Sequence, residues 1–169
     1  MAFNVRQIFA ALNDADAHYV VVGGLAVILH GYLRATADLD LAIGLEPANA
    51  RRGMDALASI GLRPRLPLAM ADFADADKRR DWRENRNMRV FPLWDPDNPL
   101  RSVDVFVDEP VAFDALLRDA VVKDLDGVRV PVASIGHLIE MKLAAARPRD
   151  LDDVDKLRQI LASEQATDP

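Results

Sequence analysis

One stretch decides the fold: residues 20–43, which read VVVGGLAVILHGYLRATADLDLAI. The apolar run that ends at Val22 is closed by Gly23-Gly24, which predicts a buried strand that stops at a turn. The apolar residues from there to about Gly31 are too many for a second strand directly after the first, so a short buried helix is expected. Over residues 38–43 acidic and then apolar residues alternate, which predicts the next strand.

Two acidic residues, Asp38 and Asp40, lie two positions apart on this predicted strand, so both carboxylates are expected to project from one face of the sheet. Neighbouring like charges raise the pKa of at least one carboxyl and cost stability unless a cation lies between them. Asp104, between Val103 and Val105 in another predicted strand, is expected to face the pair across the sheet. Three carboxylates on adjacent strands suit two Mg²⁺ ions, roughly 4 Å apart, for phosphoryl transfer.

The glycine pair adds the second half of a nucleotide site. Gly23 and Gly24 lack side chains at the start of the short helix, so backbone N–H groups and the helix dipole are expected to receive a triphosphate there. An Asp-x-Asp sequence taken alone more often decorates the solvent face of an edge strand. A strand that ends in Gly-Gly, then a helix, then Asp-x-Asp on the next strand is much rarer by chance, and this context favours a functional site.

The rest of the chain carries patterns of further helices and strands. Helices are predicted over residues 3–16, 47–60, 71–86, 111–118, 134–146 and 150–162, and strands over 88–94, 102–107 and, single or paired, 121–132, with a loop or irregular edge at 62–70. The interleaving predicts an α+β fold in which a mixed β-sheet packs against helices, with helices at the C-terminal end. Residues 1–169 are expected to form a single domain, with a core of about 18–132 and a C-terminal helical part of about 134–163.

Composition limits the function classes. Half of the 169 residues are hydrophobic and 28% are charged, which is the balance of an ordinary soluble domain. The formal net charge of −6 argues against non-specific coating of nucleic acid, which needs a surplus of Lys and Arg. The lack of cysteine excludes thiolate catalysis and cysteine-ligated metals. No apolar run reaches the roughly 18 residues of a membrane span, and no signal peptide is recognised, so a cytoplasmic protein without a membrane partner is expected.

Residues around the predicted site follow a recognisable order. They are Gly23-Gly24, His30-Gly31, Arg34, Thr36, Asp38-Leu39-Asp40 and, on a later strand, Val103-Asp104-Val105. In this order they resemble the signature of the DNA polymerase beta-type nucleotidyltransferase superfamily, and within it the minimal, AbiEii-like branch of type IV toxins. A weaker extension is similar to a later Lys and Arg-x-x-Asp-x-x-Asp of that branch: Lys142, Arg147-Pro148-Arg149-Asp150 and Asp153.

The resemblance implies an enzyme that moves an NMP from an NTP to an acceptor hydroxyl and releases pyrophosphate. It implies two Mg²⁺ ions, or Mn²⁺ in their place, on Asp38, Asp40 and Asp104, with Asp104 assisting deprotonation of the hydroxyl. The resemblance does not imply the acceptor, and we expect RNA, including tRNA, for a toxin that is paired with an antitoxin protein. Two other functions stay open: modification of a small molecule such as an antibiotic, and a catalytically silent module that binds a nucleotide or a partner protein.

Arg34, Thr36 and Lys142 complete the expected nucleotide site. Arg34 and Thr36 precede the acids, where both are expected to contact phosphate, the alternative being a solvated loop. Lys142 is a candidate phosphate ligand, although a lone Lys on an apolar helix is usually a surface residue whose ammonium group reaches water. Asp150 and Asp153 begin a helix, and N-terminal capping explains acids at that position without any function.

Many members of the superfamily carry Ser where this chain has Gly24, so the resemblance implies that backbone contacts replace a hydroxyl group there. Basic residues also gather between Lys78 and Arg89, where a surface for RNA is conceivable. They are interleaved with acids and turn around the helix axis, which favours a solvated helix over an RNA-binding ridge.

Overall fold

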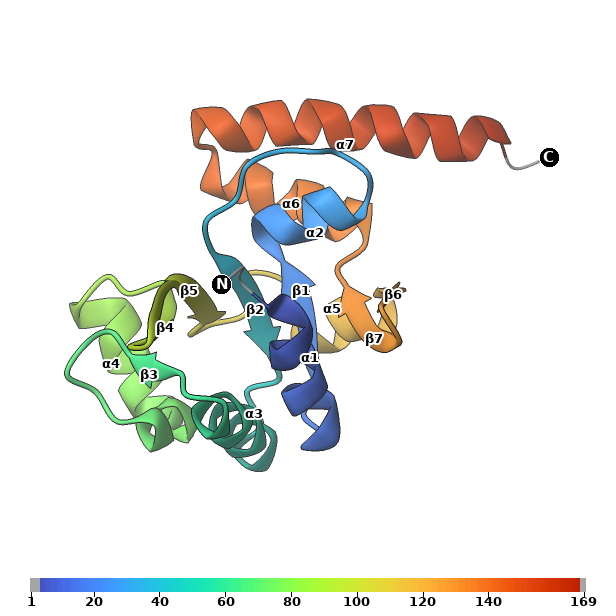
Figure 1. Cartoon of the computed structure of the whole chain (residues 1–169). Coiled ribbons are helices and arrows are strands. Elements are labelled where there is room, and N and C mark those ends of the chain that lie inside the picture. Colours follow the sequence, from blue (N-terminus) through green and yellow to red (C-terminus); the bar gives the residue numbers. More distant parts are fainter. Residues whose placement is uncertain (1–3, 168–169) are drawn as a thin grey trace.

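The structure is a computed structural model, and it describes residues 4–167 (Figure 1). The helices are α1 (Val5–Asp14), α2 (Gly23–Leu29), α3 (Pro47–Ser59), α4 (Ala76–Asn85), α5 (Phe113–Arg118), α6 (Ile135–Ala145) and α7 (Pro148–Thr167), with a 3₁₀ helix, η1, at Met70–Ala74. The strands are β1 (Tyr19–Val22), β2 (Leu39–Ile43), β3 (Arg63–Pro64), β4 (Val90–Asp95), β5 (Asn98–Phe106), β6 (Val121–Leu125) and β7 (Val128–Val132). The predicted α+β class is confirmed.

The strands form one mixed sheet in the order β3-β4-β5-β2-β1-β7-β6. β1 is antiparallel to β2 and parallel to β7, whereas β2 is parallel to β5. The strands predicted over 88–94 and 102–107 form the antiparallel pair β4–β5, and residues 121–132, expected to be single or paired, form the antiparallel pair β6–β7. All four residues of β1 are buried because this strand has a neighbour on each side and helices over both faces.

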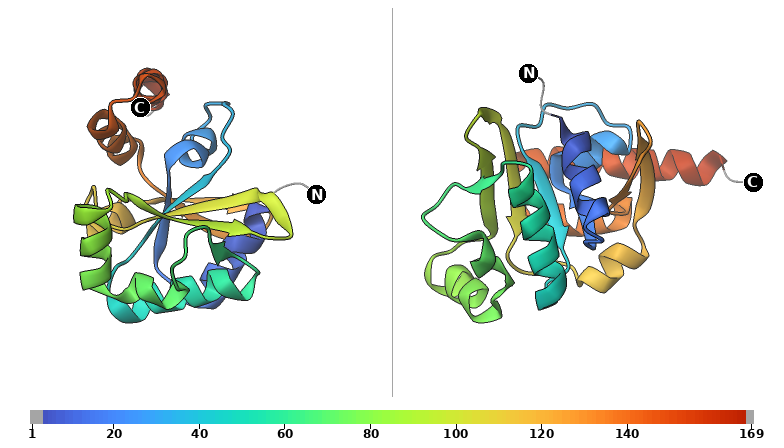
Figure 2. Two further views of the ribbon diagram at one scale, coloured as in Figure 1. Left: turned by 90° about the vertical axis from the view of Figure 1, so that its left-hand side faces the viewer. Right: turned by 60° about the horizontal axis from the view of Figure 1, so that its bottom comes forward.

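Helices cover both faces of the sheet, as Figure 2 shows in its left view. α1, α3 and α4 lie on one face, and α2, α6 and α7 stand on the other. The buried hydrophobic side chains form a continuous cluster, in which Phe9 of α1 stacks on Tyr19 of β1 with ring centroids 6.0 Å apart. The face that carries α2, α6 and α7 also carries the predicted functional residues.

Helix boundaries differ from the predicted ones where a cap residue intervenes. The helix expected over 71–86 is divided into η1 and α4, because Asp75 accepts hydrogen bonds from the N–H groups of Asp77 and Lys78 and so starts a new helix. α7 begins earlier than predicted, at Pro148, since proline is well suited to the first position of a helix. The N-terminal helix is α1, and Phe3 of its predicted range lies outside the described residues. Within residues 4–167 no helix combines the length and apolar character that crossing a membrane requires.

Candidate active site

Strand pairing brings two of the three predicted aspartates together. Asp40 lies in β2 directly beside Asp104 of β5, in parallel register, and strand neighbours are about 4.8 Å apart. Asp38 is exposed at the bend just before β2, not inside the strand as the sequence predicted. We call Asp38, Asp40 and Asp104 the acid site.

The acid site concentrates negative charge with no cation paired to it. Burial raises the pKa of Asp40 to about 6, and the charges of Asp104 and Asp38 add to the effect. Burial, with the charge of Asp38, also raises the pKa of Asp104 to about 6. Within residues 4–167 none of the three carboxylates forms an ion pair with Lys, Arg or His. A bound cation would therefore relieve a real electrostatic cost.

Gly23 makes room for Asp40. Its φ of +67° is one that only glycine adopts readily, and a Cβ atom there would overlap the Asp40 carboxylate. The N–H of Gly24 in turn favours the ionised form of Asp40 and limits the rise of its pKa. The glycine pair thus shapes the acid site as well as the start of α2.

Gly24 makes room for Thr36. A Cβ atom at Gly24 would lie only 2.6 Å from the Thr36 Oγ1 atom and 3.6 Å from the Arg34 Cζ atom. The Thr36 hydroxyl now donates a hydrogen bond to the carbonyl oxygen of Asp38, at 3.2 Å. The Thr36 hydroxyl therefore lies close to the position that the Cβ atom of a Ser at position 24 would occupy.

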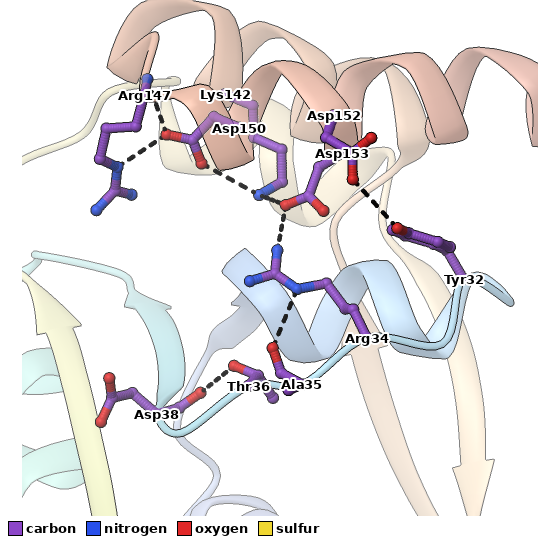
Figure 3. Close-up of polar contacts among 10 residues, drawn as sticks. All are labelled: Tyr32, Arg34, Ala35, Thr36, Asp38, Lys142, Arg147, Asp150, Asp152 and Asp153. Carbon is purple, nitrogen blue, oxygen red and sulfur yellow. Dashed lines mark hydrogen bonds and ion pairs between the residues drawn. The ribbon is translucent and has the colours of Figure 1, made fainter.

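Arg34 and Lys142 meet at Asp153, as Figure 3 shows. The Lys142 Nζ atom lies 2.6 Å from Asp153 Oδ2 and 3.5 Å from Asp150 Oδ1, and Arg34 donates to the same Asp153 oxygen. Lys142 is 7% exposed and Asp153 is 1% exposed. We call Arg34, Lys142, Asp150 and Asp153 the ion-pair corner.

The structure removes one alternative at this corner and corrects one prediction. Lys142, the candidate phosphate ligand, is not a surface lysine, because its ammonium group is buried between two carboxylates of α7. Asp153 is not a cap, since its carboxylate binds side chains from α6 and from the loop after α2. Asp150 does cap α7, because it accepts a hydrogen bond from the Arg147 N–H at 3.2 Å. The missed signal was a cation on an otherwise apolar helix, followed by acids on the next helix.

The basic residues of α4 stay away from the acid site. Arg80 pairs with Asp77 at 3.0 Å, and Arg86 pairs with Asp81 at 3.3 Å, as expected for a solvated helix. Arg79 differs because its guanidinium group is buried, donates to the carbonyl oxygen of Phe73 and lies over that residue's ring.

The donor set of the acid site fits Mg²⁺ in chemistry, since it consists of carboxylate oxygens. In the side-chain conformations of residues 4–167, no group of three Asp, Glu or His residues is placed to hold one metal ion. The reason is visible in the contacts of Asp40, whose carboxylate packs against Gly23, while Asp38 is exposed. The backbones of Asp40 and Asp104 are adjacent, so these two residues could share a ligand without any change of strand register.

Comparison with known proteins finds structures with a similar fold, but no protein of similar sequence among the curated proteins. No protein-family model and no curated protein sequence matches the chain. Among solved structures, lincomycin-bound LnuA, a lincosamide antibiotic adenylyltransferase, is 13% identical with a TM-score of 0.59, and the match covers 95% of this chain and 98% of that one.

Two further structures share this arrangement. ANT(2″)-Ia in complex with adenylyl-2″-tobramycin is 15% identical, with a TM-score of 0.56 and coverage of 96% of this chain and 95% of that one. An antigenic nucleotidyltransferase-like protein from Paracoccidioides brasiliensis is 17% identical, with a TM-score of 0.56 and coverage of 92% and 74%. The chain therefore has the fold of known nucleotidyltransferases over nearly its whole length.

Proposed function

We propose that this protein is a Mg²⁺-dependent nucleotidyltransferase that moves an NMP from an NTP to an acceptor hydroxyl. The observation that carries the proposal is the register of Asp40 beside Asp104, with raised pKa values and without a paired cation. A sheet that places acids side by side at a cost to its own stability is understandable when a divalent cation belongs between them.

Asp38, Asp40 and Asp104 would hold the metal. Bound there, Mg²⁺ supplies positive charge that stabilises the phosphates and lowers the pKa of the attacking hydroxyl. Asp104 would accept the proton of that hydroxyl in the proposed reaction, because β5 holds its carboxylate beside Asp40 at the same site.

The phosphate end of the nucleotide is assigned to the turn between β1 and α2. The backbone N–H groups of Gly23 and Gly24 would donate to phosphate oxygens. The Thr36 hydroxyl would supply the donor that Ser gives at position 24 in many members of the superfamily, once it turns from the carbonyl oxygen of Asp38. Arg34 and Lys142 would add positive charge from the ion-pair corner, where they share one carboxylate, that of Asp153.

For the acceptor we propose RNA, in a toxin with an antitoxin partner, and this rests on the sequence resemblance to the AbiEii-like branch. A small-molecule acceptor is the second candidate. It is supported by the antibiotic-modifying enzymes LnuA and ANT(2″)-Ia, which match this chain over almost the full length of both partners.

Labelled nucleotide transfer tests the reaction and the acceptor together. The protein is incubated with each α-labelled NTP, with Mg²⁺ or EDTA, and with total RNA, purified tRNA or a panel of aminoglycosides and lincosamides. We expect label on RNA only when Mg²⁺ is present, and a loss of at least about a thousandfold in the Asp38→Asn, Asp40→Asn double variant. The control is Asp55→Asn, because Asp55 is an exposed aspartate of α3 far from the acid site.

Each outcome of this experiment decides between the candidates. Label on an antibiotic and not on RNA replaces the RNA acceptor with a small molecule. Binding of an NTP without transfer to any acceptor overturns the proposal that the protein is an enzyme. The remaining candidate is then the catalytically silent module that binds a nucleotide. Transfer that persists in EDTA or in the double variant overturns the metal site.

A further inference from the structure

The second half of α7 packs against the rest of residues 4–167 only through Ile160 and Leu161. The buried residues of this helix all lie in its first ten positions: Asp150, Asp153, Val154 and Leu157. From Arg158 to Thr167 every residue is exposed except Ile160 and Leu161, which are half-buried. Figure 1 shows this half extending beyond the rest of the molecule. A helical segment of this length with so few tertiary contacts is marginal in water, so a partner that packs against it would stabilise it.

One stripe of α7 borders a hollow. The hollow has a volume of about 710 Å³ and lies between α7 and the end of α2. Its lining comprises Lys156, Gln159, Ile160, Ser163, Glu164 and Thr167 from α7, together with Gly31 and Tyr32. Steps of three and four residues keep these α7 positions on one face of the helix, which is the pattern of a helix-packing surface. Leu33, which follows Tyr32 in the sequence, is 84% exposed.

The charges on this stripe are arranged symmetrically about Ile160. Lys156 lies four residues before Ile160 and Glu164 four residues after it, and neither forms an ion pair with a described residue. They are too far apart to pair within one helix, since eight residues span about 12 Å. A second α7 that runs antiparallel, with Ile160 against Ile160, places each Lys156 beside the Glu164 of the other helix. A parallel helix would instead set Lys156 against Lys156.

We propose that this stripe of α7 binds the same stripe of a second copy of the chain, so that the protein forms a symmetric, antiparallel dimer. A two-fold axis through Ile160 makes the contact isologous, and it forms two Lys156–Glu164 pairs at once. Each free helical half enters the hollow of the other copy, beside Tyr32. The acid site is not part of this surface, so the dimer does not depend on the proposed activity.

Charge reversal with rescue tests the proposal. Sedimentation velocity across a wide range of protein concentration measures the dimer dissociation constant of the wild type, Lys156→Glu, Glu164→Lys and the double variant. We expect each single variant to weaken the dimer at least about tenfold, because every reversal turns two attractions into two repulsions. The double variant restores both pairs with exchanged signs and should return to within about threefold of the wild type.

The matched control is Arg158→Glu, which makes the same charge change on the exposed side of α7, away from the stripe. It should dimerise like the wild type, and urea unfolding of all variants checks that the fold is kept. A wild type that stays monomeric at every concentration overturns the proposal. A dimer that tolerates both single reversals, or a double variant that is not rescued, overturns the antiparallel register.

Discussion

Two groups of buried or half-buried charges lie on the same face of the sheet, and they are balanced in opposite ways. In the ion-pair corner, Lys142 and Arg34 neutralise Asp153, and Lys142 also faces Asp150. In the acid site, by contrast, Asp40 and Asp104 lie side by side on neighbouring strands, and the carboxylates lack an ion-pair partner among the described residues. The corner is complete within the chain, whereas the acid site is complete only with a cation from outside.

The pKa shifts follow the same division. Burial tends to raise the pKa of Asp150, but the hydrogen bond from Arg147 and the charges of Arg147 and Lys142 outweigh it, so this pKa falls below its ordinary value. Burial raises the pKa of Asp40 to about 6, and neighbouring acids reinforce the effect. A buried carboxylate with partners contributes to holding α6, α7 and the loop together. A carboxylate without them is a candidate ligand.

The largest effect is expected from breaking the balanced group. Lys142→Met leaves two buried carboxylates with one cation fewer, and it should destabilise the protein by about 3 kcal/mol or more. Urea unfolding measures this, with Lys123→Met on the edge strand β6 as a control that should change little. A loss below about 1 kcal/mol would mean that water already reaches the corner.

A smaller effect of opposite sign is expected in the acid site. Because the pKa of Asp40 rises from 3.8 to about 6 on folding, the folded protein binds this proton more tightly. Stability is therefore lost as pH rises through that window. Asp40→Asn should stabilise the metal-free protein by about 1–2 kcal/mol at pH 8, after allowance for solvent screening, and by nothing at pH 4.

Unfolding curves at both pH values, in EDTA, check the prediction for Asp40. Asp55→Asn serves again as the exposed control and should show no such pH dependence. Equal stability of Asp40→Asn and wild type at pH 8 would show that the acid site carries no electrostatic cost, and the contrast with the corner would disappear.

The smallest effect is expected at the rim of the balanced group. Arg147 binds Asp150 at 2.8 Å, but its side chain is 77% exposed. Arg147→Ala should therefore cost less than about 1 kcal/mol in urea unfolding, far less than Lys142→Met. Arg149→Ala is the control, since Arg149 is an exposed neighbour. A cost equal to that of Lys142→Met would place Arg147 within the corner and not at its edge.

Local patterns were sufficient for most elements of the fold. The apolar run that ends at Val22 became β1, because a strand that is buried on both faces needs consecutive apolar residues, and the alternation that includes Leu39 to Ile43 became β2. Asp126-Gly127, a typical hairpin-turn pair, joins β6 to β7. Cap residues were harder: Asp75 started α4 where the helical pattern alone gave no break.

The sequence by itself determined the α+β class, the strand–helix–strand start and the identity of Asp38, Asp40 and Asp104 as candidate ligands. Only the tertiary structure decided that Asp40 stands beside Asp104, that Thr36 fills the space over Gly24, and that Lys142 is bound by acids of α7. The physical reason is the separation in sequence over which each effect acts. Periodicity and turn chemistry act between residues a few positions apart. Charge balance depends on groups that folding brings together: Asp40 and Asp104 are more than 60 positions apart, and Lys142 and Asp153 are 11 apart.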